Sequence, residues 1–466
     1  MTGKTRSFHF LGICGTAMGS VAAALRERGF TVTGSDENIY PPMSTFLESR
    51  GVSLNAGYRP ENIPADADVV IIGNAIKRGN PEIEAVLNRK LYYLSLPEIL
   101  RNEFLRGRHN LVVTGTHGKT TTTAILTWIM IVAGFEPSYM IGGIPKNLGQ
   151  GARFHDSKFF VLEGDEYDSA FFDKRSKFIH YLPELLIVNN IEFDHADIFK
   201  DLDQIKTSFG HLLRIVPQNG MVLLNGDDPN CLDVAKECHA QLVEIGFSPN
   251  CAQQIRDVAY LTEGSRFTLQ NETYELPLMG EFNVRNAAMA LTAARFYGAP
   301  PDEIREALAT FTGIARRQEV RGEARGVKVI DDFGHHPTAI AQTLTALRHR
   351  YRDQRLWAVF EPRSNTTRRA VFQRELADAL KLADGVLISQ VARLEQIPES
   401  DRLDPEAVME SITAAGKVAF YELDADHIVE RLVPLLRPDD VVAVFSNGGF
   451  DRIHEKILAR LRALPA

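Results

Sequence analysis

A glycine-rich loop with one lysine stands between a short apolar run and a helical pattern. Residues 111–114 read Leu-Val-Val-Thr, and residues 115–121 read Gly-Thr-His-Gly-Lys-Thr-Thr. In a strand–loop–helix unit of this kind, backbone N–H groups and the helix N-terminus suit a polyphosphate anion. Lys119 could neutralise the β- and γ-phosphates, and the Thr120 hydroxyl could bind Mg²⁺. Val113 stands where the pattern G-x-x-x-x-G-K-[ST] has its first glycine, but strand, loop and helix occur in the required order.

Acidic side chains follow two further apolar segments. Residues 159–162 lead into Glu-Gly-Asp-Glu-Tyr-Asp at 163–168, and residues 185–188 lead into Asn-Asn-Ile-Glu-Phe-Asp-His at 189–195. Mg²⁺ prefers oxygen ligands and keeps several waters, so one or two of these carboxylates would suffice. His195 could bind a second metal ion or orient a phosphate. Any one of these acids could instead cap a helix or carry a solvated loop charge.

The N-terminal segment contains a second glycine loop with a weaker signal. Residues 8–11 are apolar, Gly12 and Gly15 follow, and a strand-like run at 31–34 ends at Ser35-Asp36. An acid at this place often binds a ribose hydroxyl, and the pattern alone is compatible with NAD. A nicotinamide dehydrogenase does not explain Gly-Lys-Thr at 118–120. Two sites of nucleotide type therefore favour one for ATP and one for a nucleotide-linked substrate.

The C-terminal part repeats the strand–loop–helix pattern. Residues 327–330 are apolar, 331–337 read Asp-Asp-Phe-Gly-His-His-Pro, and the next segment places Ile340, Leu344, Leu347 and Tyr351 on one helical face. Polar loops at 361–366 and 446–449 follow two more apolar runs. Loops at the carboxyl ends of parallel strands form the usual ligand crevice.

The whole chain predicts an α/β architecture of three domains. Its 466 residues correspond to about three domains of ordinary size, with boundaries expected near residues 107 and 312. We expect domains at 1–107, 108–312 and 313–466, each with a mostly parallel sheet flanked by helices. The first and third should be Rossmann-like, and the second should resemble a P-loop ATPase.

Composition excludes several classes of protein. The net charge of −8 argues against a general nucleic-acid binder. The longest apolar run, residues 128–135, is too short to span a membrane. Four cysteines without C-x-x-C spacing do not form a disulfide framework, which is typical of a cytoplasmic protein.

Together these motifs resemble the Mur ligase family, the ATP-dependent ligases that build the peptidoglycan peptide. The resemblance covers essentially the whole chain. It rests on residues 115–121, on Asp-Glu at 165–166, on Asp-His at 194–195 and on Gly-Glu-Phe-Asn-Val-Arg-Asn at 280–286. It implies that Asn283 and Asn286 face adenine, that Asp332 binds the ribose and that Arg317 acts from the C-terminal domain.

The residues and the resemblance together predict five sets of site residues. The ATP-binding residues are Gly115, Thr116, His117, Gly118, Lys119, Thr120, Thr121, Asn283, Asn286, Arg317 and Asp332. The catalytic residues are Lys119, Glu166, His195 and Arg317. The Mg²⁺ ligands are Thr120, Glu166 and His195. The nucleotide-linked substrate would contact Gly12, Gly15, Thr16, Ser35, Asp36, Asn74 and Ala75, and the amine substrate His335, Arg363, Ser364, Asn365, Thr366 and Asn447.

Within the family, the chain is similar to the branch that acts on UDP-N-acetylmuramate itself. One activity of that branch adds L-alanine, and the other adds the recycled tripeptide L-alanyl-γ-D-glutamyl-meso-diaminopimelate. The stretches at 40–45, 77–81, 165–177 and 446–450 favour the tripeptide activity, with the alanine activity as the alternative. A carboxylate-rich peptide needs a forked cation, and Arg363 offers one, unless it merely pairs with Glu361 at the surface. A nucleotide-switched binding protein without synthetic activity is a further alternative.

Overall fold

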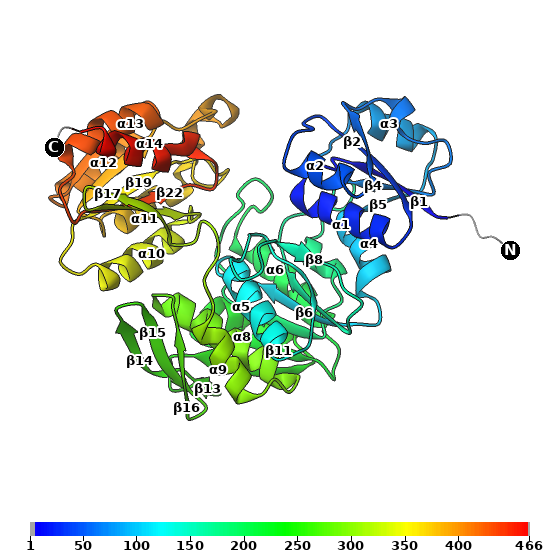
Figure 1. Cartoon of the computed structure of the whole chain (residues 1–466), viewed down its shortest axis with the longest axis horizontal. Helices are drawn as coiled ribbons and strands as arrows, with labels where there is room; N and C mark the ends of the chain where they lie inside the picture. The colour runs from blue at the N-terminus through cyan, green and yellow to red at the C-terminus, as the bar shows by residue number, and fades with distance from the viewer. Residues whose placement is uncertain (1–4, 465–466) are drawn as a thin grey trace.

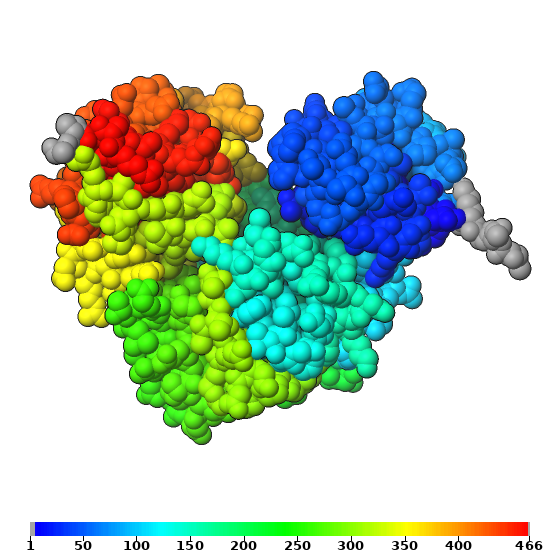
Figure 2. Space-filling model, in the orientation of Figure 1, coloured from blue at the N-terminus to red at the C-terminus, as the bar shows by residue number. Residues whose placement is uncertain are grey.

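The computed structural model describes residues 5–464 and consists of three lobes, each built on its own sheet (Figure 1). The N-terminal and C-terminal lobes lie on either side of the top of the central lobe. Figure 2 shows the surface hollowed between these two outer lobes, with the central lobe at the base of the hollow.

The N-terminal lobe is a five-stranded parallel sheet in the order β3-β2-β1-β4-β5. Its elements are β1 (Ser7–Leu11), α1 (Thr16–Glu27), β2 (Thr31–Asp36), α2 (Met43–Glu48), β3 (Ser53–Ala56), β4 (Val69–Ile72), α3 (Pro81–Asn88), β5 (Tyr93–Ser95) and α4 (Leu96–Leu100). The chain leaves β1 toward β2 and β3, then returns to β4 on the other side. The strand order therefore switches between β1 and β4, and a crevice is expected outside the carboxyl ends of these two strands.

The central lobe has an eight-stranded sheet in the order β13-β12-β11-β10-β6-β9-β7-β8, parallel except for β8. Its strands are β6 (His109–Thr114), β7 (Ser138–Met140), β8 (Ala152–Arg153), β9 (Phe159–Glu163), β10 (Leu185–Val188), β11 (Met221–Asn225), β12 (Gln241–Gly246) and β13 (Gln253–Gln254). Its helices are α5 (Lys119–Val132), α6 (Leu202–Arg214), α7 (Pro229–Val234), α8 (Glu281–Phe296) and α9 (Pro301–Ala309). In the sheet, β6 lies between β9 and β10. The acidic runs that follow β9 and β10 therefore start beside the glycine loop, which follows β6.

Helix α5 forms despite four consecutive threonines, which have low helix propensity. The hydroxyls of Thr123 and Thr127 each donate to the carbonyl four residues earlier, at 2.7 Å, so these polar groups are satisfied within a buried helix. The helix packs against α8 and α9.

An antiparallel sheet that the sequence analysis did not predict follows β13. It consists of β14 (Arg256–Leu261), β15 (Gly264–Leu269) and β16 (Glu272–Leu276). The C-terminal lobe then has a six-stranded sheet in the order β17-β18-β22-β19-β20-β21, in which only β17 is antiparallel.

The elements of the C-terminal lobe are β17 (Glu319–Ala324), β18 (Val327–Asp332), α10 (Pro337–Arg350), β19 (Leu356–Phe360), α11 (Gln373–Leu380), β20 (Gly385–Ser389), α12 (Pro405–Ala414), β21 (Val418–Glu422), α13 (Ala425–Leu432), β22 (Val441–Phe445) and α14 (Ile453–Arg462). The predicted α/β class with mostly parallel sheets is confirmed. None of the helices within residues 5–464 is long and apolar enough to cross a membrane.

The N-terminal and central lobes share apolar contacts. Phe104, in a π-helical turn after α4, is buried with its ring 4.7 Å from that of Phe154 in the central lobe. The guanidinium carbon of Arg28 lies 4.0 Å from the centre of the Phe104 ring. Phe172, a few residues after the acidic run at 163–168, contacts Tyr93 of β5 edge-on, with 4.9 Å between the ring centres. These rings fix where the N-terminal lobe sits against the central sheet.

We predict that Phe104→Ala destabilises the protein by about 3–5 kcal/mol, because it leaves a cavity at this junction. The measurement is a shift of the urea unfolding midpoint. Phe296→Ala, at a partly exposed ring on α8, is the control and should shift the midpoint far less. Equal shifts for the two variants would contradict a shared core at Phe104.

Candidate active site

The glycine loop joins β6 to α5 and needs glycine at two positions. Gly115 and Gly118 have φ of +127° and +79°, and a Cβ on Gly118 would lie 2.6 Å from Oδ1 of Asn286. Asn190, after β10, clamps the loop: its carbonyl accepts from the Thr116 N–H at 3.1 Å, and its Oδ1 accepts from the His117 N–H at 2.7 Å. The first turn of α5 holds no acidic residue. The loop therefore offers a preformed cradle for an anion.

Lys119 is folded back over this loop into a buried ion pair. Its Nζ donates to the Gly115 carbonyl at 2.6 Å and to both carboxylate oxygens of Glu166 at 3.0 and 2.8 Å. Burial opposes both charges, but the attraction between them outweighs it, so the pKa of Lys119 is raised and that of Glu166 is lowered. Both groups are therefore charged.

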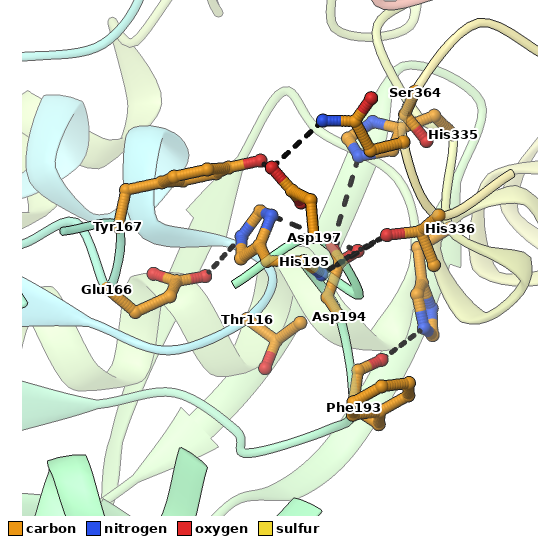
Figure 3. A network of polar contacts seen from close by, with 12 residues as sticks. Thr116, Glu166, Tyr167, Phe193, Asp194, His195, Asp197, His335, His336 and Ser364 are labelled. Atoms are coloured by element: carbon orange, nitrogen blue, oxygen red, sulfur yellow. Dashed lines mark hydrogen bonds and ion pairs between the residues drawn. The ribbon is translucent and has the colours of Figure 1, made fainter. Parts of the chain in front are cut away.

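His195 contacts the same carboxylate as Lys119, and Figure 3 shows its imidazole beside Glu166. Its Nε2 lies 2.9 Å from Glu166 Oε1, and the Tyr167 ring lies 4.2 Å from the imidazole. Burial disfavours the imidazolium, but the hydrogen bond and charge of Glu166 prevail and raise the pKa of His195. His195 has a φ of +57°, a strained conformation for a residue that is not glycine.

Thr120 and Thr121 begin α5 and are buried. The Thr120 hydroxyl donates to Oε1 of Glu163, at the end of β9, at 3.0 Å. The three predicted metal ligands thus lie in two places. Thr120 lies beside Glu163, and Glu166 lies beside His195. Glu163 was not among the predicted ligands, although it stands in the acidic run, because its chain position alone does not show which carboxylate faces the loop.

The donor set fits Mg²⁺. It offers a hydroxyl and two carboxylates beside an anion cradle, which is typical of Mg²⁺ shared between protein and phosphate. Burial raises the pKa of Glu163, against the favourable charge of Lys119. A divalent cation next to Glu163 would supply the positive charge that this buried carboxylate needs.

Helix α8 carries the two asparagines predicted to face adenine, and both are buried. Asn283 Nδ2 donates to the Met279 carbonyl at 2.7 Å. Asn286 lies beside Gly118, and its buried Nδ2 has no hydrogen-bond partner among the described residues. An unpaired buried amide is costly unless a ligand satisfies it, so Asn286 fits a role in nucleotide binding.

Asp332 and Arg317 come from the C-terminal lobe. Asp332 is buried and accepts from the backbone N–H groups of Gln318 at 2.9 Å and Gly334 at 2.7 Å. The Arg317 guanidinium lies 5.0 Å from the centre of the Phe333 ring. Its neighbour Arg316 is engaged within the lobe, with Asp331 at 3.3 Å and the Ser446 carbonyl at 2.7 Å. Of the two arginines, Arg317 is the one whose positive charge favours the ionised forms of Glu163 and Asp332.

A cavity of about 830 Å³ lies at the strand switch of the N-terminal lobe. Of the predicted substrate residues it is lined by Gly12, Gly15, Thr16, Asp36 and Ala75. Tyr40, Tyr58, Lys77 and Arg78 also line it and had not been assigned. Lys77 suits a phosphate group, whereas the guanidinium of Arg78 donates to both carboxylate oxygens of Glu84 at 3.0 Å.

Two predicted residues of this set do not line the cavity. Ser35 is fully buried, with its hydroxyl 3.4 Å from Nε2 of His9, because side chains alternate along β2 and Asp36 takes the outward position. Asn74 instead donates to the Asp168 carbonyl of the central lobe at 3.1 Å. The structure therefore does not place these two side chains at the cavity, and their contact with the substrate stays a prediction.

Two of the predicted amine-substrate residues dock the C-terminal lobe on the central lobe. Thr366 donates to Asp194 Oδ1 at 2.7 Å and accepts from the His195 N–H at 3.1 Å, and Asn365 donates to Asp197 at 2.9 Å. Ser364 hydrogen-bonds Thr367 of its own loop at 2.8 Å. These polar groups are already used, which weakens their assignment as direct contacts of a substrate.

The other three remain available. Arg363 is half-exposed, with Nη1 3.6 Å from Glu361, and it packs on Gly448, where a Cβ would lie 2.6 Å from its Cδ. Asn447 has a buried Oδ1 without a hydrogen-bond partner among residues 5–464. His335 Nε2 lies 3.9 Å from Asp194 Oδ2. Their role in binding an amine substrate stays a prediction.

A nucleotide cradle at the end of a parallel sheet, with acids from both neighbouring strands and an arginine from a third lobe, defines a three-lobed nucleotide-dependent enzyme. The comparisons with known proteins are specific. The Mur ligase middle domain matches residues 113–294, the domain described as Mur ligase family, catalytic domain, matches 7–107, and the Mur ligase glutamate ligase domain matches 316–448. The chain belongs to the Mur ligase family.

Among relatives, the chain is 44% identical over 457 residues, 97% of each chain, to the UDP-N-acetylmuramate–L-alanyl-γ-D-glutamyl-meso-2,6-diaminoheptandioate ligase of Escherichia coli K12. It is 32% identical over 466 residues, 98% of this chain and 96% of the relative, to the UDP-N-acetylmuramate–L-alanine ligase of Acetivibrio thermocellus. The crystal structure of a murein peptide ligase from Psychrobacter arcticus 273-4 superposes with a TM-score of 0.72 at 35% identity, covering 99% of this chain and 100% of that one.

We predict that Gly118→Ala weakens ATP binding at least tenfold, because the new Cβ clashes with Asn286 in addition to the backbone strain. Gly134→Ala is the matched control: Gly134 follows the same helix with the same φ of +79°, and a Cβ there would meet nothing within 4 Å. Titration calorimetry with ATP should separate the two variants. Similar affinities for both would contradict the proposed contact between the loop and Asn286.

Proposed function

We propose that this protein is an ATP-dependent ligase that joins the tripeptide L-alanyl-γ-D-glutamyl-meso-diaminopimelate to UDP-N-acetylmuramate, in peptidoglycan recycling. The observation that carries the proposal is the whole-chain similarity, which is greater to the tripeptide-adding relative than to the alanine-adding one. The arrangement of Lys119, Glu166 and His195 at the glycine loop supports the ATP-dependent step. A cytoplasmic location is also supported by the use of nucleotide substrates. The four cysteines are free thiols, which agrees with that location.

The reaction proceeds in two steps. A muramyl carboxylate oxygen attacks the γ-phosphorus of ATP, the bond to the β-phosphate oxygen breaks, and an acyl phosphate and ADP form. The peptide's N-terminal amine then attacks the acyl carbon, phosphate leaves and the amine loses a proton. The protein contributes mainly positioning and charge neutralisation.

Each residue has a defined task in this scheme. Lys119 leaves Glu166 for the transferring phosphoryl group, whose charge replaces that of the carboxylate as its partner. Arg317 approaches the same oxygens from the C-terminal lobe, while Asn283, Asn286 and Asp332 hold the nucleoside. Mg²⁺, held by Thr120 and Glu163 or by Glu166 and His195, would neutralise phosphate charge.

The proton of the incoming amine is accepted by His335 rather than by Asp194. Burial lowers the pKa of His335, against the attraction of Asp194, so its imidazole is neutral near pH 7 and can accept a proton. Asp194 is buried, but three histidines around it hold its pKa well below the usual range. A carboxylate with so low a pKa is a poor base, and it serves instead to orient His195 and His335.

UDP-N-acetylmuramate fits the cavity at the N-terminal strand switch. Asp36 accepts from the Cys14 N–H at 2.9 Å and can turn to a ribose hydroxyl. Lys77, and Arg78 once it leaves Glu84, would neutralise the diphosphate. The muramyl end would then extend toward the central lobe, whose Asp168 already contacts the Asn74 loop. Asp168 lies two residues after Glu166, so this direction would bring the muramyl carboxylate toward the glycine loop.

We predict that Lys119→Ala lowers the ligation rate by several powers of ten, because it removes a cation beside the transferring phosphoryl group. The assay is phosphate release that requires ATP, UDP-N-acetylmuramate and the amine together. Lys236→Ala, an exposed lysine of the central lobe, is the control and should keep the wild-type rate. A Lys119→Ala rate above about a tenth of the wild type would sink the assignment, provided that its thermal unfolding shows a folded protein.

The amine substrate is tested by assaying L-alanine and the tripeptide side by side. We predict that the tripeptide is used better, and that Arg363→Ala raises the KM for the tripeptide roughly tenfold or more with little effect on the binding of UDP-N-acetylmuramate. Arg374→Ala, at an exposed arginine of α11, should leave the KM unchanged. Better ligation of free L-alanine by the wild type would replace the tripeptide function with the alanine-adding one.

A further inference from the structure

His117, Glu192 and His336 converge where the C-terminal lobe meets the glycine loop. His117 belongs to the loop itself, Glu192 follows β10, and His336 caps the start of α10 in the other lobe. One ligand atom from each lies within 4.8 Å of the other two. His117 belongs to the predicted ATP set, but the scheme above gives no task to its side chain or to those of Glu192 and His336.

The spacing of these atoms is close to that of a metal site. His117 Nε2 lies 3.5 Å and His336 Nδ1 3.6 Å from the same oxygen, Oε2 of Glu192. Tetrahedral Zn²⁺, with bonds of about 2.0–2.1 Å, holds its ligand atoms roughly 3.4 Å apart. Two imidazoles and a carboxylate are a common ligand set for Zn²⁺, whereas Mg²⁺ prefers oxygen alone.

His117 lacks a good partner in the structure. Its Nε2 is buried without a hydrogen bond among the described residues, and the 3.5 Å separation from Glu192 is that of an ion pair and not of a short hydrogen bond. The imidazoles of His117 and His336 lie 4.5 Å apart, tilted by 43°. A buried nitrogen next to a carboxylate and a second imidazole is therefore poised for a cation.

Neighbouring residues hold His336 and Glu192 in place by hydrogen bonds, as the hydrogen-bond partners of ligands do in metal sites. His336 Nε2 lies 3.1 Å from the Phe193 carbonyl (Figure 3), which places the proton on Nε2. The lone pair of Nδ1 is then left on the side of Glu192, whose Oε2 lies 3.6 Å away. That lone pair otherwise accepts only a long bond of 3.3 Å from the Thr338 N–H. The Thr338 hydroxyl donates to Glu192 Oε2 at 2.6 Å and holds the carboxylate in place.

The charge state also suits metal binding. Burial lowers the pKa of His336 to about 4, so its imidazole is neutral near pH 7. Glu192 is ionised, since the histidines outweigh burial and hold its pKa at about 2. Neutral imidazole and ionised carboxylate are the forms that bind a metal ion.

We propose that His117, Glu192 and His336 form a binding site for a divalent transition-metal ion of the zinc type, with water as the fourth ligand. The ion would join the C-terminal lobe to the glycine loop. Because the site lies beside the phosphate cradle and bridges two lobes, its occupation slows ligation and stabilises the arrangement of the lobes seen here. It is separate from the Mg²⁺ ligands, which carry more oxygen and surround Lys119.

The test is titration of the untagged full-length protein with Zn²⁺, and with Co²⁺ as a visible probe, without nucleotide. We expect one equivalent of Zn²⁺ to bind, a tetrahedral Co²⁺ spectrum, and a higher thermal unfolding midpoint. Glu192→Gln and His336→Asn should each weaken Zn²⁺ binding at least tenfold, about 1.4 kcal/mol. Glu192→Gln keeps an acceptor for Thr338, so it tests ligation by the carboxylate without loss of that bond.

Control variants identify the site. His195→Asn removes the histidine beside Glu166, and His211→Asn removes one from the last turn of α6; both should retain tight Zn²⁺ binding. Loss of binding in His195→Asn with retention in His336→Asn would assign the ion to the Mg²⁺ ligands and overturn the proposal. Absence of Zn²⁺ binding by the wild-type protein would overturn it as well. Unfolding midpoints measured without metal show whether each variant is folded.

Discussion

The ion pair between Lys119 and Glu166 is the interaction around which the site is organised. Both charges are buried, and breaking such a pair by removing one partner costs about 3–5 kcal/mol. His195 adds a second positive partner to the same carboxylate. A polyphosphate entering the cradle supplies a new partner for Lys119, and a cation supplies one for Glu166. Nucleotide and metal are therefore expected to bind together, since each compensates the charge that the other leaves unpaired.

The same carboxyl ends of the sheet hold the C-terminal lobe. Asp194 and Asp197, a few residues from Glu192, accept hydrogen bonds from the 364–367 loop, and Thr338 of α10 reaches Glu192. The segment after β10 thus carries both His195, a predicted Mg²⁺ ligand, and the docking contacts of the C-terminal lobe. Any movement of the C-terminal lobe must change the surroundings of His195, so lobe position and catalytic geometry are coupled through direct contacts.

Local patterns in the sequence predicted the three sheets, the glycine loop and the strand ends that carry acids, because each depends on residues close in the chain. The helical face with Ile340, Leu344, Leu347 and Tyr351 is indeed buried against its sheet. The domain boundaries at residues 107 and 312 stay a prediction. Contacts between distant segments left no local signal: Asn190 clamps the loop through its backbone and amide, and Glu163 rather than Glu166 meets Thr120. Thr366 was assigned to the substrate because a polar loop at a strand end looks the same whether it binds a ligand or another lobe.

The distribution of the site over three lobes follows from the chemistry. An acyl phosphate is lost to water unless the amine reaches it in a closed site, and no single sheet edge offers room for a nucleotide, a UDP-linked acid and a peptide. The N-terminal lobe is held near by aromatic contacts at Phe104 and Tyr93, which are insensitive to ligand charge. The C-terminal lobe is held instead by hydrogen bonds and charges around Asp194 and Glu192, which nucleotide and metal can alter. Because the two junctions differ in physical nature, we expect the N-terminal lobe to keep a steady position and the C-terminal lobe to close in response to ligands.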